Sequence, residues 1–283
     1  MGQPHPAPVS RGQVADLVGR LHGIDEALIL TSFHQSALPL ALLLRLAGVR
    51  RIAAVSNDYP GSLLDVRHVV DESLDVPEAE RMLAVARAAG FELPEGDDGK
   101  LAVQRPLPDI GELTGQLIGV GTDADTGTYV VVHPGTSAPA RTWPAERHRQ
   151  AVRELVEDGN RVVVTGTERE LTAYVAGDVA ADLGGATTFA ELAAVIEGAG
   201  VLVAGNTGPA HLAAAVGTPV VCLFSPVVPA VRWAPYGVPA MLLGDQQAPC
   251  RGSRARVCPV PGHPCLSQVT SEQVVKAVRE LTQ

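Results

Sequence analysis

The second half of the chain alternates short apolar runs with longer segments of helical periodicity. Thr128–Val132 and Arg161–Thr165 are rich in valine, and Ala145–Glu157 between them repeats its apolar positions at helical spacing. Short buried strands that alternate with helices are typical of a parallel sheet covered on both faces. Further elements of this kind are a helix from about Glu168, a segment near Leu183–Gly185, a helix over Ala190–Glu197 and a final helix over Ser271–Leu281.

The most informative stretch is Val201–Phe224, in which two apolar runs flank a glycine-rich turn and a short helical segment. Pro209 suits the first turn of that helix, and Gly217 suits the position just after its end. The unpaired amides and the dipole at such a helix start form a site for a phosphate. Polar side chains stand beside it at Asn206, Thr207 and His211. This stretch therefore predicts a site for a phosphorylated small molecule.

The first half of the chain has a thinner α/β pattern. Its predicted elements are a helix over Gln13–Leu21, a strand over Ala27–Thr31, a helix over Ser36–Leu46, a strand over Arg51–Val55 and a helix over Glu78–Ala89. A stretch rich in Gly, Thr and Asp, Gly111–Gly127, indicates a boundary. We therefore predict an N-terminal α/β domain over residues 1–122 and a C-terminal Rossmann-like domain over residues 123–283.

Composition and charge narrow the class of protein. The 283 residues carry a net charge of −9, which disfavours a nucleic-acid-binding surface. No apolar run reaches the roughly 18–20 residues that span a bilayer. The polar, proline-rich residues that open the chain do not have the apolar core of a secretory leader. We expect a cytoplasmic protein without a nucleic-acid partner.

Two groups of residues raise the question of a metal. Cys250, Cys258 and Cys265 fall in one loop near His263, at spacings longer than those of usual structural zinc sites. A loop packed by small side chains is the favoured interpretation, and whether these thiols bind anything stays open. Asp123-Ala124-Asp125 resembles the Asp-x-Asp pair of metal-dependent sugar transferases but falls in the boundary segment, so no metal is expected.

Polar clusters follow the predicted strands of the second half. They are His133–Ser137, Gly166–Glu168, Thr187–Thr188, Asn206–His211 and Ser225. Ligands of open α/β sheets bind at the carboxyl ends of the strands. The convergence of several such clusters predicts one shared binding site.

Four segments together resemble glycosyltransferase family 9, the heptosyltransferase-like enzymes. They are His133-Pro134-Gly135-Thr136, Arg141-Thr142-Trp143-Pro144, Gly166-Thr167-Glu168 and Asn206 to Ala215. The resemblance implies the GT-B fold of two Rossmann-like domains with parallel sheets. It also implies inverting, metal-independent transfer of a heptose-like sugar from a nucleotide diphosphate, typically ADP, to a glycan or lipid-linked acceptor. The alternatives are a catalytically silent nucleotide-sugar-binding protein and an epimerase of the same architecture.

By this resemblance the donor-binding residues are His133, Gly135, Thr136, Ser137, Arg141, Gly166, Glu168, Thr187, Thr188, Asn206, Thr207, Gly208, Pro209 and His211. Arg141 would contact a phosphate, Glu168 the ribose hydroxyls, and the loop at residues 187–189 the base. Each has an ordinary alternative, such as a solvated charge for Arg141 or a helix cap for Glu168. Asn206 departs from the aspartate that is frequent in the family.

The first domain departs further from the family pattern. Family members usually open with a strand that runs into a Gly-Asp turn, and that aspartate is their proposed base; this sequence has no such opening. We therefore expect a domain without its first strand and helix, with apolar surface exposed. His34 is the candidate base, with an ordinary loop contact as its alternative. Ser32, Gln35 and Asp58 are acceptor-side candidates. Peripheral contact with the membrane follows only if the acceptor is lipid-linked, and the oligomeric state stays open.

Overall fold

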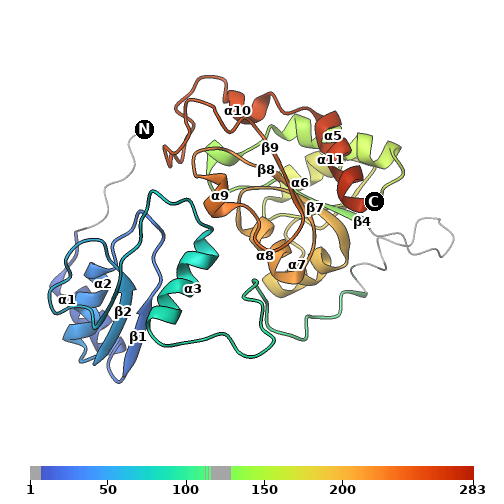
Figure 1. Ribbon diagram of the computed structural model, residues 1–283. Helices are drawn as coiled ribbons and strands as arrows, with labels where there is room; N and C mark the ends of the chain where they lie inside the picture. The colour runs from blue at the N-terminus through green and yellow to red at the C-terminus, as the bar shows by residue number, and fades with distance from the viewer. Residues whose placement is uncertain (1–7, 112, 114, 116–128) are drawn as a thin grey trace. The chain divides into compact units, whose positions relative to one another are not determined.

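The computed structural model describes residues 8–111, 113, 115 and 129–283. The chain folds into two compact units, Met1–Gly99 and Lys100–Gln283, each an α/β structure with a parallel sheet (Figure 1). The predicted α/β class is confirmed. The predicted boundary at residues 122 and 123, and Asp123-Ala124-Asp125 beside it, lie outside the described residues.

The second unit contains a six-stranded parallel sheet in the order β6-β5-β4-β7-β8-β9. Its strands are β4 (Tyr129–His133), β5 (Val162–Val164), β6 (Ala181–Asp182), β7 (Ala199–Gly205), β8 (Val220–Leu223) and β9 (Ala240–Leu243). The chain moves outward from β4 to β6 and then returns to place β7 on the other side of β4. The strand order therefore reverses between β4 and β7, which is where ligands bind in this class of sheet.

Helices cover both faces of this sheet because successive side chains of a strand point to opposite faces. Val130 and Val132 pack in one core with α5 (Ala145–Glu157), α6 (Arg169–Ala176) and α11 (Ser271–Thr282). Val131 packs in the other core with α7 (Phe189–Glu197) and α8 (Gly208–Val216). Figure 1 shows α7 and α8 on the opposite side of the sheet from α5 and α11. Shorter elements of the unit include η1 (Pro139–Arg141), α9 (Ala230–Trp233) and α10 (Pro264–Ser267).

The first unit contains a three-stranded parallel sheet in the order β1-β2-β3. Its elements are α1 (Arg11–Arg20), β1 (Glu26–Ile29), α2 (Leu38–Leu46), β2 (Arg51–Val55), β3 (Val66–His68) and α3 (Glu78–Ala88). Ala41 and Leu44 of α2 pack against Ile29 and Ile52 of the sheet. Residues 8–25 contain α1 and no strand, so β1 lies at the edge of the described sheet, and Leu30 just after it is 55% exposed.

In the described ranges, no helix combines the length and the apolar character needed to cross a bilayer.

Candidate functional site

Two loops predicted to bind the ligand meet at the point where the strand order reverses. His133 at the end of β4 lies in register with Ala204 of β7, so the two strands end side by side. The loop that follows β4 carries Gly135, Thr136 and Ser137, and the turn that follows β7 carries Asn206, Thr207 and Gly208. Strand pairing therefore brings together segments about 70 residues apart in the chain.

Arg141 links these two loops. Its Nη1 donates a hydrogen bond of 3.1 Å to the backbone oxygen of Asn206, and its side chain is half-buried. Burial lowers the pKa of Arg141, but a guanidinium keeps its charge at neutral pH. Its Nε is buried and finds no hydrogen-bond partner among the described residues. This geometry favours a fixed cation beside the α8 turn over a solvated surface charge.

Asn206 stabilises the turn through its side chain. It is 4% exposed, its Nδ2 donates to the Ser225 backbone oxygen at 3.4 Å, and its Oδ1 accepts from the Ser225 amide at 3.3 Å. A side-chain amide satisfies both backbone groups because it carries one donor and one acceptor. Asn206 thus ties the end of β7 to the residues after β8, and an aspartate carboxylate at this position would supply only acceptors.

The start of α8 contributes a smaller set of amides than the sequence pattern alone indicates. The Thr207 amide donates to the Gly205 oxygen at 2.8 Å, and Pro209 has no N–H. Gly208 is exposed, and its amide is one of those at a helix start without an intrahelical acceptor. The first turn of α8 has no acidic residue, so the positive end of the helix dipole is not neutralised there.

His133 is held as a neutral hydrogen-bonding group. Its Nδ1 lies 3.0 Å from the Thr165 hydroxyl oxygen at the end of β5. Burial lowers the pKa of His133 to about 4. Behind it, burial and then the nearby His133 lower the pKa of His148 to about 3. Neither imidazole is a cation at neutral pH, so Arg141 carries the positive charge among these three side chains.

These two histidines make stability sensitive to acid. Above pH 6.5 both are neutral in the folded and unfolded states; between 6.5 and about 4 the unfolded chain binds protons that the folded chain does not. Folding stability should therefore fall as the pH falls through this window, by about 1.4 kcal/mol per pH unit for each imidazole.

The measurement is the free energy of unfolding in urea at several pH values. His148→Gln should reduce the slope of the unfolding free energy between pH 6.5 and 4 by the contribution of one imidazole. An identical slope for His148→Gln and the wild type would contradict the burial of a neutral His148.

The remaining donor-side candidates divide into exposed groups and groups already used by the fold. Glu168 and Ser137 are exposed; Glu168 occupies the N-cap position of α6 but makes no side-chain capping bond to the described residues. The Thr188 hydroxyl accepts from the Glu191 amide at 3.3 Å in a capping box that begins α7. The Thr188 side chain therefore serves as the cap of α7, whereas the Glu168 side chain makes no such bond at the start of α6 among the described residues.

Three more candidates lie near the same strand ends. Gly166 follows β5 and is partly exposed, and Thr187 precedes the cap of α7. The Thr136 hydroxyl lies 2.8 Å from the Ala138 oxygen, to which it donates, so it stabilises its own turn. These positions stay predictions as ligand contacts.

His211 has an aromatic neighbour that the sequence pattern did not single out. It lies on α8 against Trp233 of α9, with ring centroids 6.4 Å apart. Burial, and then the charge of Arg141, lower the pKa of His211. Trp233 lies after β8, in a chain with 4% aromatic residues. Because aromatic residues are so scarce in this chain, the presence of Trp233 was the one signal in the sequence that could have drawn attention to this position.

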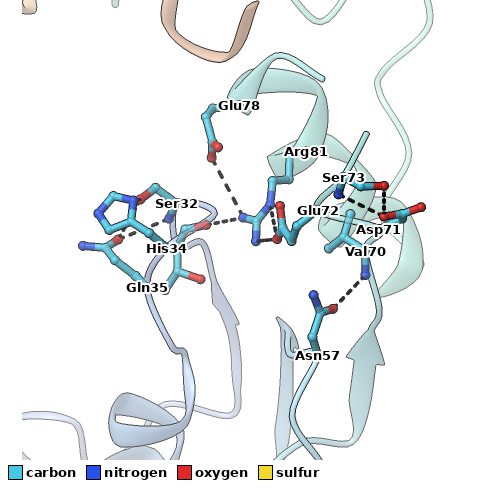
Figure 2. A network of polar contacts seen from close by, with 11 residues as sticks. Ser32, His34, Gln35, Asn57, Val70, Asp71, Glu72, Ser73, Glu78 and Arg81 are labelled. Carbon is cyan, nitrogen blue, oxygen red and sulfur yellow. Dashed lines mark hydrogen bonds and ion pairs between the residues drawn. The ribbon is translucent and has the colours of Figure 1, made fainter. Parts of the chain in front are cut away.

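In the first unit, the candidate base His34 shares the loop after β1 with two acceptor-side candidates, Ser32 and Gln35. The Ser32 hydroxyl lies 3.0 Å from Nδ1 of His34 and 3.4 Å from Oε1 of Gln35 (Figure 2). His34 and Gln35 are exposed. Asp58 is exposed in the loop after β2, where its backbone oxygen accepts from the Ser56 hydroxyl at 2.8 Å.

Arg81 of α3 supports this loop and was missed by sequence reasoning. Its side chain is 1% exposed; Nε and Nη2 donate to Oε1 of Glu72 at 3.3 and 2.8 Å, and Nη1 donates to the Thr31 backbone oxygen (Figure 2). Arg81 therefore joins α3, the loop after β3 and the loop that carries Ser32 and His34.

Replacing Arg81 with methionine should destabilise the first unit by about 2–3 kcal/mol, because Glu72 loses its buried partner and the Thr31 oxygen loses a charged donor. Arg50→Met removes an ion pair with Asp25 in which both side chains are 81% exposed, so it should cost less than about 1 kcal/mol. Urea denaturation followed by far-ultraviolet circular dichroism measures both. Equal effects of the two substitutions would contradict a structural role for Arg81.

The cysteine-rich loop packs into the second unit. Cys250 and Cys265 belong to the core beneath α5 and α11, and Cys258 packs against it. Burial raises the pKa of Cys265 to about 11. The described residues contain no group of three or more His, Cys, Asp or Glu side chains placed to hold a metal ion.

Residues 25–262 match glycosyltransferase family 9 (heptosyltransferase). The chain belongs to this family. It is 30% identical over 253 residues to lipopolysaccharide heptosyltransferase 1 of Pseudomonas aeruginosa, which covers 84% of this chain. The chain spans 65% of that relative's length.

Solved structures of the family show the same fold. The glycosyltransferase family 9 protein of Veillonella parvula superposes with a TM-score of 0.73 at 18% identity, over 97% of this chain and 80% of its own. The ADP-heptose lipopolysaccharide heptosyltransferase II of E. coli superposes with a TM-score of 0.67 at 19% identity, over 96% of this chain and 80% of its own. The predicted GT-B type, with Rossmann-like domains, is confirmed.

Proposed function

We propose that the protein is an inverting glycosyltransferase that moves a heptose-like sugar from an ADP-linked donor to a hydroxyl of a glycan or lipid-linked acceptor. The observation that carries the proposal is the contact between Arg141 and the Asn206 backbone across the point where the strand order reverses. Family membership supports sugar transfer, and the E. coli relative named for ADP-heptose supports the choice of donor.

The donor site supplies positive charge where the leaving group becomes negative. When the acceptor oxygen attacks the anomeric carbon, the bond from that carbon to the diphosphate breaks and the diphosphate takes the electron pair. Fixed donors aimed at that charge lower the barrier. Arg141 and the exposed amide of Gly208 are the proposed donors, and attack from the face opposite the diphosphate inverts the anomeric carbon.

Outside the diphosphate site, Glu168 is the proposed partner of the ribose hydroxyls, because it is exposed and its carboxylate is not used in capping α6. Thr187 is proposed to lie beside the base, and His211 beside the sugar or phosphate. The charge on Arg141 is proposed to serve in place of a metal ion.

We assign acceptor binding to the first unit of the chain. His34 is the proposed base that takes the proton of the acceptor hydroxyl, with Ser32, Gln35 and Asp58 as acceptor contacts. The Ser32 hydroxyl lies 3.0 Å from His34 Nδ1, which supports the orientation of the imidazole. A lipid-linked acceptor would place the protein at the cytoplasmic face of a membrane.

The test is incubation of the protein with ADP-heptose and heptose-free lipopolysaccharide core, with UDP-linked sugars in parallel. ADP release, together with a product whose anomeric configuration is opposite to that of the donor, is the expected result. His34→Ala should retain ADP binding and lose transfer. Binding of ADP-heptose without turnover would favour the silent nucleotide-sugar-binding alternative, and failure to bind any nucleotide sugar would contradict the proposed site.

A further inference from the structure

We propose that His263 is a positioning residue of the donor site, acting through Arg141; this rests on the proposed function. His263 Nε2 lies 3.0 Å from the backbone oxygen of Ala140, to which it donates. Ala140 is fully buried and immediately precedes Arg141. Ala140 and His263 are 123 residues apart in sequence, so only the tertiary fold brings them together.

The second backbone group of Ala140 is bonded to the same loop. The Ala140 amide donates to the backbone oxygen of Arg256 at 3.0 Å. Both backbone polar groups of the buried Ala140 are thus hydrogen-bonded to the cysteine-rich loop, the N–H to a backbone oxygen and the C=O to the His263 side chain. A buried carbonyl needs such a donor, so removal of the imidazole should shift the turn that orients Arg141.

The backbone around His263 is held in an uncommon conformation. His263 has φ of 49°, in the left-handed region that residues other than glycine rarely adopt, directly after Gly262 at φ of 78°. Its backbone oxygen accepts from the Ser267 amide at 3.1 Å, and the Ser267 hydroxyl donates to the Gly262 oxygen at 2.9 Å. These local hydrogen bonds offset the cost of the uncommon backbone conformation, and in this conformation the imidazole contacts the Ala140 oxygen.

The stretch of chain that carries His263 contacts residues on both sides of Arg141 in sequence. Cys250 and Cys265 bury it in the core, and the Val269 oxygen accepts from Trp143 Nε1 at 3.2 Å. Residues one before and two after Arg141 are therefore bonded to one stretch of chain, which runs from Arg256 through His263 and α10 to Val269.

A double-mutant cycle on ADP binding tests the proposal. His263→Ala should raise the dissociation constant for ADP by roughly tenfold in the wild-type background. In an Arg141→Ala background the same substitution should change this constant little. A donating side chain of similar reach should restore binding, so His263→Gln should bind ADP more tightly than His263→Glu. Arg256→Ala is the matched control, because Arg256 contributes only its backbone oxygen to the Ala140 contact.

Isothermal titration calorimetry gives these constants, and thermal unfolding shows whether each variant is folded. If His263→Ala does not fold, the Gln and Glu variants provide the same comparison. Equal losses in both backgrounds, or equal ADP affinity of the Gln and Glu variants, would overturn the role of His263. If the wild type binds no ADP, the proposed function fails; if Arg141→Ala weakens binding while His263 does not couple to it, only this inference fails.

Discussion

Replacing Arg141 with alanine is expected to weaken ADP binding by roughly 10- to 100-fold, the range for loss of a hydrogen-bonded charged partner. The guanidinium is fixed by its 3.1 Å bond to the Asn206 oxygen, so it does not have to be ordered when the ligand binds. A planar guanidinium also matches phosphate oxygens in pairs, which a lysine does not. Arg141→Lys should therefore recover only part of the lost affinity.

The control is Arg153→Ala, which removes an exposed positive charge from α5. Titration calorimetry at two salt concentrations separates local contact from general attraction, because attraction between distant exposed charges weakens with salt. Arg153→Ala should leave ADP affinity within twofold of the wild type. Unchanged affinity in Arg141→Ala would remove this residue from the donor site.

Replacing Trp143 with alanine should lower the free energy of unfolding by about 3–5 kcal/mol, the usual cost of deleting a large buried aromatic side chain. Trp143 is 1% exposed in the core beneath α5, and its ring meets that of His148 edge to face with centroids 4.7 Å apart. Its indole N–H donates to the Val269 oxygen at 3.2 Å, so the substitution also leaves a carbonyl without its donor.

Trp143→Phe separates packing from hydrogen bonding. It keeps an aromatic ring and loses the N–H, so its loss of stability should fall between zero and that of the alanine variant. Urea denaturation followed by far-ultraviolet circular dichroism measures all three proteins. A loss below about 1 kcal/mol for Trp143→Ala would contradict the assignment of this family-motif tryptophan to the core.

The elements with local start and stop signals were predictable from the sequence. Ala145–Glu157 is α5 with the predicted bounds, and the strand, turn, helix and strand around Pro209 and Gly217 are present. Gly217 adopts φ of 88° at the end of α8, which is the conformation that favours glycine there. In these segments the hydrophobic period and the capping residues agree with the tertiary fold.

The elements that were missed are short and depend on distant partners. β3 has three residues and is defined by its pairing with β2, and β9 by its pairing with β8. α9 and α10 have four residues each, too few for a hydrophobic period to appear. Their positions follow from tertiary contacts that no local pattern contains.

The location of the candidate donor site was predictable, but the use of individual atoms was not. The motifs placed Arg141 and the α8 turn at neighbouring strand ends, as the structure has them. They did not show that Asn206 pairs with the Ser225 backbone or that Thr188 caps α7. Arg81 carried no motif signal, and His263 stood out only as a neighbour of the three cysteines, because each side chain bonds a backbone oxygen far away in sequence.

The most direct test of the donor site is a crystal structure of the protein with ADP. The diphosphate should lie at the carboxyl ends of β4 and β7, within hydrogen-bonding distance of the Arg141 guanidinium and the Gly208 amide. ADP bound at another edge of the sheet, or bound there with Arg141 turned away from the phosphates, would contradict the proposed mechanism.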